Sequence, residues 1–228
     1  MKPLTKQFWL GVKDLMPLVS GILPFGLIAG ATGVSLGMTP EMIMGMTLLF
    51  FAGSAQLASY SLIQDNAPFL IILLTVIVIN LRFAIYSASF SGLIGPLRKR
   101  YRFPLAYMLS DQVYGLCQRP EQVEKTAPER LFYLSGVASS MLLAWIGSVA
   151  LGIVLGSEIP PSWSLEFTIP LAFLTMLVGT ISNRRMLLAA IISASAAIIF
   201  YALPYNLGFL IAVGCGVLSG YLIRPSHP

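Results

Sequence analysis

Long apolar runs separated by short polar connections make up nearly the whole chain. They cover residues 15–36, 39–63, 68–95, 131–155, 165–182, 186–203 and 207–223. A helix needs about 20 residues to cross a bilayer, and these runs are continuous, unlike the alternating strands of a membrane barrel. The pattern predicts an all-α, polytopic integral membrane protein with about six to eight transmembrane helices.

Three stretches interrupt this pattern. Residues 52–56 combine small residues with an amide side chain, residues 80–82 place an asparagine and an arginine in the middle of a run, and residues 103–118 are short and polar for a crossing. Irregular backbone is tolerated at membrane depth only where protein or a water-filled cavity covers it. We therefore expect broken or re-entrant segments near 52–56, 80–82 and 103–118.

The first run contains residues that disturb helices, among them Pro24 and Gly26. In a membrane helix, prolines and glycines permit kinks and the close approach of neighbouring helices. The spacing of Gly26, Gly30 and Gly33 favours close helix packing, and an unwound, ligand-facing turn at 23–26 is the alternative.

Basic residues indicate which ends of the helices face the cytoplasm. Lysines precede the first run, and the densest basic group lies at 98–102. Because positive residues concentrate on the cytoplasmic side, we expect both groups, and both chain termini, in the cytoplasm. An even number of crossings must then separate the two groups, so one of the three runs between them has to be re-entrant or broken.

Composition agrees with a single transmembrane domain over residues 1–228. Charged residues make up only 10% of the chain, against about 25% in soluble domains. The net charge of +5 arises from basic residues in short connections, where they act as topology signals. We therefore expect the lipid bilayer as a partner and no nucleic acid. Cys117 and Cys215 lie far apart, and the one histidine is His227. We therefore expect no metal, no cofactor and no enzymatic activity.

Arg82 is the costliest residue of the pattern, because it falls near the middle of the 68–95 run. An arginine at that depth disfavours insertion by roughly 2.5–3.5 kcal/mol and usually has a partner or a water-filled cavity. Asp111 is the acidic residue set within an apolar segment, so we predict a buried Arg82–Asp111 pair. Two roles stay open for this pair, namely substrate binding and a purely structural contact that fixes helix register.

Four motifs in the N-terminal half resemble the AzlC family, which includes the YgaZ and BrnF proteins. They follow the family's order, as LPFGLIAGATGVSLGMTPEMIMGM, FFAGSAQLASYSLI, LLTVIVINLRFAIYSASF and LSDQVYGL. The resemblance covers about residues 16–116, and the remainder agrees only in length and hydropathy. At one position the chain departs from the family, because Phe83 follows the arginine where histidine is common, and a titratable group is missing there.

The resemblance implies the large subunit of an exporter of branched-chain amino acids (leucine, isoleucine and valine) and methionine in the bacterial inner (plasma) membrane. It also implies a small membrane partner of the AzlD, YgaH or BrnE type and transport driven by the proton or ion gradient. The chain contains no GxxxxGK[ST] phosphate loop, so it carries no ATPase of its own.

The candidate substrate-binding residues follow from the interruptions and the family motifs. A zwitterionic amino acid needs groups for its carboxylate and ammonium and an apolar pocket for its side chain. The candidates are Pro24, Phe25, Gly26, Phe51, Gly53, Ser54, Gln56, Asn80, Arg82, Tyr86, Asp111 and Gln112, with Leu57 as a further pocket residue. Arg82 or a half-helix N-terminus would hold the carboxylate, and Asp111 or free carbonyls the ammonium.

Two other classes of function stay open. A permease subunit of an ATP-driven transporter would use the short connections at 98–103 and 118–130 for coupling, and it would copurify with a nucleotide-binding protein. A channel or a non-transporting assembly factor would leave the transport activity with the small partner. Flux through the purified chain, with and without that partner, separates these classes from a secondary transporter.

Overall fold

The computed structural model describes residues 3–156, 181, 183–203 and 207–223, and every element within them is a helix. Three helices are long and apolar enough to cross a membrane, and they are α1 (Pro3–Ser35), α4 (Phe69–Ile94) and α8 (Ala127–Gly156). The shorter helices are α2 (Pro40–Phe50), α3 (Gly53–Gln64), α5 (Lys99–Tyr107), α6 (Asp111–Cys117), α7 (Pro120–Val123), α10 (Arg184–Ile199) and α11 (Leu207–Leu222). The predicted all-α membrane architecture is confirmed. The run at 165–182 lies outside the described residues except for Ile181.

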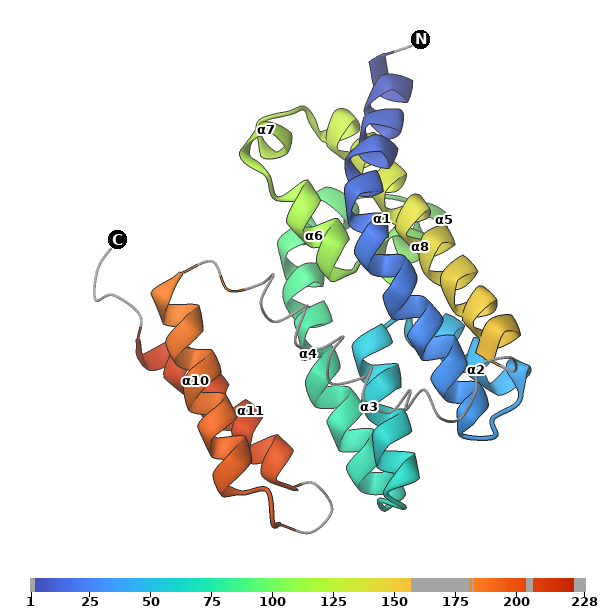
Figure 1. Ribbon diagram of the computed structural model, residues 1–228. Coiled ribbons are helices and arrows are strands. Elements are labelled where there is room, and N and C mark those ends of the chain that lie inside the picture. Colours follow the sequence, from blue (N-terminus) through green and yellow to red (C-terminus); the bar gives the residue numbers. More distant parts are fainter. Residues whose placement is uncertain (1–2, 157–180, 182, 204–206, 224–228) are drawn as a thin grey trace.

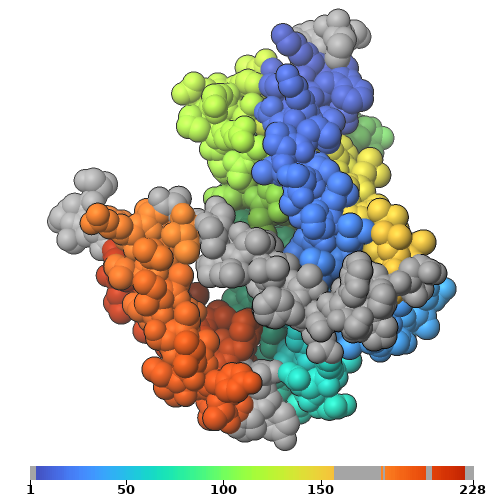
Figure 2. Space-filling model, in the orientation of Figure 1, coloured from blue at the N-terminus to red at the C-terminus, as the bar shows by residue number. Residues whose placement is uncertain are grey.

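Helices α1 and α8 pack against each other along most of their length (Figures 1 and 2). Glycines allow this close approach, because a Cβ built on Gly30 would lie 2.7 Å from the backbone nitrogen of Ile153, and one on Gly26 would be 2.7 Å from the Cβ of Ser148. Real Cβ atoms essentially never approach other atoms within 3.0 Å. The α1 helix continues through Pro24, so close packing at Gly26 is confirmed and the alternative of an unwound turn at 23–26 is wrong.

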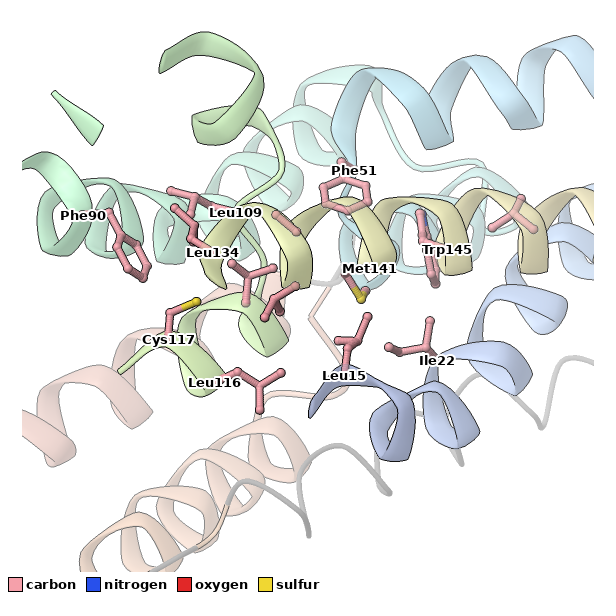
Figure 3. Close-up of a cluster of buried hydrophobic side chains, with 14 of the residues drawn as sticks. Leu15, Ile22, Phe51, Phe90, Leu109, Leu116, Cys117, Leu134, Met141 and Trp145 are labelled. Atoms are coloured by element: carbon pink, nitrogen blue, oxygen red, sulfur yellow. The ribbon is translucent and has the colours of Figure 1, made fainter. Parts of the chain in front are cut away.

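Apolar side chains of α1, α4, α6, α8 and the turn after α2 meet in one core (Figure 3). Leu15 and Ile22 project from α1 toward Met141 and Trp145 of α8. The α6 helix contributes Leu116 and Cys117. This core fixes the half-length helices against the long ones, so the ends of the short helices have defined positions inside the bundle.

Helices α2 and α3 form a re-entrant hairpin. The chain turns at Phe51, whose φ is 44°, and α3 begins at Gly53. Across the turn, Gln56 Nε2 donates hydrogen bonds to Thr47 Oγ1 at 3.0 Å and, more weakly, to the carbonyl of Ile43 at 3.4 Å. These contacts pair the end of α2 with the start of α3, so the helices run antiparallel. The predicted break near 52–56 is confirmed, with the turn itself at Phe51 and Ala52.

Helices α5 and α6 form a second hairpin, which confirms the half-length segments expected at 103–118. The α6 helix starts after Ser110, whose Oγ accepts a weak hydrogen bond from the Val113 N–H at 3.5 Å. Its Tyr114 ring stacks on Tyr86 of α4, with ring centroids 4.7 Å apart, and meets the Phe90 ring edge-on at 6.1 Å. The α6 helix therefore runs beside α4 and in the same direction, back toward the end from which α5 entered.

The tips of the two hairpins touch each other. The ring of Tyr107, the last residue of α5, lies 5.6 Å from the ring of Phe51, and its hydroxyl donates a hydrogen bond to the carbonyl of Leu48. The α2–α3 hairpin has its base where α1 ends and α4 begins, whereas the α5–α6 hairpin has its base where α4 ends. The hairpins thus enter the bundle from opposite ends and meet inside it.

The predicted interruption of the chain at 80–82 is wrong. Helix α4 runs without a break from Phe69 to Ile94. The physical reason is that Arg82 finds its partners on the two hairpin tips, as described below, so the backbone hydrogen bonds of α4 need not open to accommodate it. A polar side chain within an apolar run can be satisfied by its neighbours without disturbing its own helix.

The hairpin assignment explains the crossing number that the basic residues require. Helices α1 and α4 cross while α2–α3 returns, so the lysine-rich start of α1 and the basic group at 98–102 lie at the same end of the bundle. A hydrogen bond of 2.9 Å from Lys125 Nζ to Gln7 Oε1 ties the connection after α6 to that same end. The even number of crossings is confirmed, and the assignment of this end to the cytoplasm stays a prediction.

The C-terminal helices α10 and α11 pair with each other to one side of the bundle (Figure 1). Ser193 Oγ donates a hydrogen bond of 2.8 Å to the carbonyl of Ala212. Gly208 and Gly216 let the helices approach closely, because Cβ atoms there would lie 2.8 Å from the carbonyl carbon of Phe200 and 3.1 Å from the Cβ of Ser193. These helices correspond to the predicted runs at 186–203 and 207–223.

Cysteine labelling tests the re-entrant hairpin. Single cysteines placed by Ser35→Cys and Asp65→Cys, in a chain whose own cysteines are replaced by alanine, should react with a membrane-impermeant maleimide from the same side of the membrane. An Arg100→Cys variant should react only from the other side. If α2 and α3 together formed one transmembrane crossing, positions 35 and 65 would react from opposite sides, and the hairpin would be contradicted.

Candidate functional site

Arg82 of α4 lies where the two hairpin tips meet. Its Nη1 is 2.5 Å from Oδ2 of Asp111, and its Nη2 donates a hydrogen bond of 2.6 Å to Ser54 Oγ. Asp111 is the first residue of α6, and Ser54 is in the first turn of α3. The predicted Arg82–Asp111 pair is confirmed, although it is part-buried rather than buried, and one guanidinium group connects α4 to both hairpins.

Tyr86 completes this polar cluster. It lies one helical turn after Arg82 on α4, and its hydroxyl donates a hydrogen bond to Oδ1 of Asp111. Both oxygens of the Asp111 carboxylate therefore accept hydrogen bonds, one from a cation and one from a phenol. Hydrogen bonds to ionised groups are roughly twice as strong as neutral ones, so these contacts fix the carboxylate in one orientation.

The ion pair is only partly enclosed. The side chains of Arg82 and Asp111 are 26% and 32% exposed, and Arg82 Nε is buried without a hydrogen-bond partner among the described residues. Asp111 lies in the first turn of α6, where the helix dipole favours a negative charge. The arrangement can bind a molecule that carries both charges, because a carboxylate can replace Asp111 at the guanidinium and an ammonium can replace Arg82 at Asp111.

Several predicted site residues gather at this place. Ser54, Arg82, Tyr86 and Asp111 are joined by hydrogen bonds. Phe51 and Gly53 form the tip of the α2–α3 hairpin. The ring of Phe25 on α1 reaches this tip, because a Cβ on Gly53 would lie 2.8 Å from Phe25 Cε1.

Other predicted site residues lie elsewhere. Gln56 is 1% exposed, and its amide is occupied inside the hairpin by Thr47 and by Tyr60, whose hydroxyl accepts at 2.8 Å. Pro24 lies on the exposed side of α1, Gly26 in the α1–α8 contact and Leu57 in the core. Gln112 is half-buried beside Asp111. Asn80 is turned about 200° around α4 from Arg82, and its buried Oδ1 has no partner in the described part of the chain.

Two aromatic residues that contact the α2–α3 hairpin tip were not among the predicted site residues. Tyr107 makes the contact between the tips, and Trp145 of α8 packs against the start of α3. Tyr107 lies in a segment already singled out as half-length, so its place near a tip was available as a signal. Trp145 lies in an uninterrupted apolar run, and nothing in that run points to a neighbour on another helix.

These features define a transporter-like polytopic membrane protein, with two re-entrant hairpins around a charged cluster. The chain belongs to the AzlC family, since the family model described as AzlC protein matches residues 17–159. It is similar to inner membrane protein YgaZ of Escherichia coli K12, with 23% identity over 96% of this chain and 92% of that protein. It is also 28% identical to an uncharacterized membrane protein of Archaeoglobus fulgidus, over 94% and 95% of the two chains. No solved structure matches the chain significantly.

Proposed function

We propose that this protein is the large subunit of a secondary transporter that exports branched-chain amino acids, namely leucine, isoleucine and valine, together with methionine. It acts in the bacterial inner membrane and uses the proton or ion gradient. The observation that supports this most directly is the Arg82–Asp111 pair at the meeting point of two re-entrant hairpins. Ionisable residues at membrane depth and helices that end there are typical of substrate sites in secondary transporters.

The charges of the cluster match those of an amino acid. A zwitterion has one carboxylate and one ammonium, and the site offers one guanidinium and one carboxylate 2.5 Å apart. When the substrate carboxylate binds Arg82 and its ammonium binds Asp111, the net charge of the site is unchanged. Exchange of partners therefore avoids placing an unpaired charge at membrane depth, which would be costly. The aromatic rings of Phe25 and Phe51 at the same tip suit an apolar side chain.

A small membrane subunit of the AzlD, YgaH or BrnE type is the proposed partner. Within the described residues, only 6% of the most apolar stretch of α4 is buried. This helix therefore has a long apolar face that can contact either the lipid bilayer or helices of a second subunit. The exposed side chains there include Leu70, Leu73, Leu74, Ile77, Leu81 and Ile85, which suit packing by van der Waals contact, as is common between membrane helices.

Efflux from proteoliposomes tests the proposal. Vesicles containing the chain and its small partner are loaded with labelled leucine, valine or methionine, and efflux is measured with and without a pH gradient. We expect efflux well above that of protein-free vesicles and faster with the gradient. Efflux that requires a copurified ATPase would instead indicate an ATP-driven permease, and undiminished efflux by the small partner alone would indicate an assembly factor.

A further inference from the structure

Helix α3 begins inside the bundle without a capping side chain. Its N-cap residue is Ala52, and no described side chain accepts a hydrogen bond there, whereas Thr39 and Ser110 cap α2 and α6. The first N–H groups of any helix lack partners within the helix. Ala52 and Ala55 are 2% and 1% exposed, and Gly53 between them is half-buried. The start of α3 therefore presents backbone donors that call for an acceptor.

Arg82 adds a positive charge at the same place. Its guanidinium donates to Ser54 in the first turn of α3, and the N-terminus of a helix already carries a partial positive charge. Two positive groups side by side favour an anion between or beside them. In this structure the nearby anion is Asp111, which belongs to the other hairpin and is shared with Tyr86.

Trp145 provides an independent sign that an acceptor binds here. It is 3% exposed, and its indole Nε1–H has no hydrogen-bond partner among the described residues. A Cβ built on Gly53 would lie 2.8 Å from Trp145 Cζ2, and Cζ2 is bonded to the ring carbon that carries Nε1. Cη2 is the ring atom nearest to that position, so the six-membered ring of the indole lies against the first residue of α3, and Nε1 is two bonds from Cζ2. Buried donors without acceptors are rare in native structures.

We propose that the carboxylate of the transported amino acid binds at the N-terminus of α3, between the Arg82 guanidinium and the indole N–H of Trp145. This assignment rests on the proposed function and names the group of the substrate that the site binds first. One carboxylate oxygen accepts from Arg82 and the first-turn N–H groups, and the other accepts from Trp145 Nε1. Asp111, released from Arg82, then accepts the substrate ammonium. Trp145 is therefore a substrate-binding residue that distinguishes amino acids from amines.

The test follows the Trp145 indole N–H by NMR in the full-length chain with its small partner, labelled with ¹⁵N in the tryptophan side chains. Trp145→Phe assigns the resonance, and Trp9→Phe is the matched control, since Trp9 is 56% exposed. The probes are leucine, isocaproate, which lacks the amino group, and isoamylamine, which lacks the carboxylate. We expect leucine and isocaproate to shift the Trp145 resonance and isoamylamine to leave it unchanged. Trp145→Phe should weaken leucine binding about tenfold, or about 1.4 kcal/mol, and Trp9→Phe should not.

The outcomes separate this proposal from the proposed function. If leucine binds while the Trp145 resonance stays unmoved, the carboxylate site is overturned and the exporter proposal stands. If isocaproate shifts the resonance in a protein that neither binds nor exports leucine, the carboxylate site stands and the exporter proposal fails. If no carboxylate shifts it, the site is overturned. Should Trp145→Phe not fold, benzothienylalanine at position 145 keeps the ring shape and removes the N–H, so the affinity comparison is still made.

Discussion

Replacing Arg82 with glutamine should abolish export, with a decrease of at least about 100-fold in the efflux rate. The substitution removes the guanidinium that connects α4 to Ser54 and Asp111 and leaves the Asp111 carboxylate with Tyr86 as its remaining described donor. Removing one partner of a buried ion pair typically destabilises a protein by about 3–5 kcal/mol, and the cost here should be smaller because the pair is only partly enclosed. A low protein level alone would therefore not show that Arg82 binds substrate.

The double variant Arg82→Gln/Asp111→Asn separates binding from stability. Its two amides are neutral and can form a hydrogen bond, so the double variant should restore the amount of protein in the membrane while export stays lost. A purely structural pair would instead recover export together with protein level. Quantitative immunoblotting of membranes and leucine efflux are the two measurements. Arg102→Gln, at an arginine that bonds only weakly to the Gly95 carbonyl at 3.4 Å, is the control and should change efflux less than about twofold.

Replacing Gly53 with valine should disrupt the tip of the α2–α3 hairpin and reduce export more than about tenfold. A Cβ at this position would lie 2.8 Å from Phe25 Cε1 and 2.8 Å from Trp145 Cζ2, and both rings are held by α1 and α8. Overpacking of this kind costs about 1–3 kcal/mol. The melting temperature of the purified protein should fall accordingly. Gly45→Val on α2 is the matched control, because nothing lies within 4 Å of its Cβ position, and equal melting temperatures for the two variants would contradict the prediction.

The sequence predicted two kinds of feature well: the partner of Arg82, found by eliminating the other acidic residues, and the returning segments, found by counting membrane crossings. Asp111 was identified because it was the acidic residue inside an apolar segment, and its charge had to compensate Arg82. The parity of the basic groups required a returning segment among the first three runs, and α2–α3 is that segment. The half-length helices at 99–107 and 111–117 followed from a segment too short to cross. Each inference used a constraint that membranes impose on every chain.

The errors concern interactions between distant segments. Asn80 and Arg82 suggested a helix break. Composition alone does not distinguish a polar side chain that interrupts its own helix from one that forms hydrogen bonds with residues of other helices. The turn itself lies at Phe51, which has a positive φ of 44°. An aromatic residue does not predict a positive φ, so the sequence gives no signal for the turn at this position. Gln56 was expected to face substrate, but its amide bonds to Thr47, which becomes a neighbour only when the hairpin forms, and to Tyr60, one turn further along α3.

The first six helices repeat one order of elements. A long helix followed by a re-entrant hairpin occurs twice, as α1 with α2–α3 and as α4 with α5–α6, and the second unit is inverted relative to the first. In transporters, inverted repeats allow the two sides of the membrane to be served by equivalent motions around one fixed site. Here the repeats are alike in shape but not in chemistry, because one tip carries the uncapped start of α3 and the other carries Asp111. This chemical difference makes the two hairpin tips, and the ends of the bundle from which they enter, inequivalent.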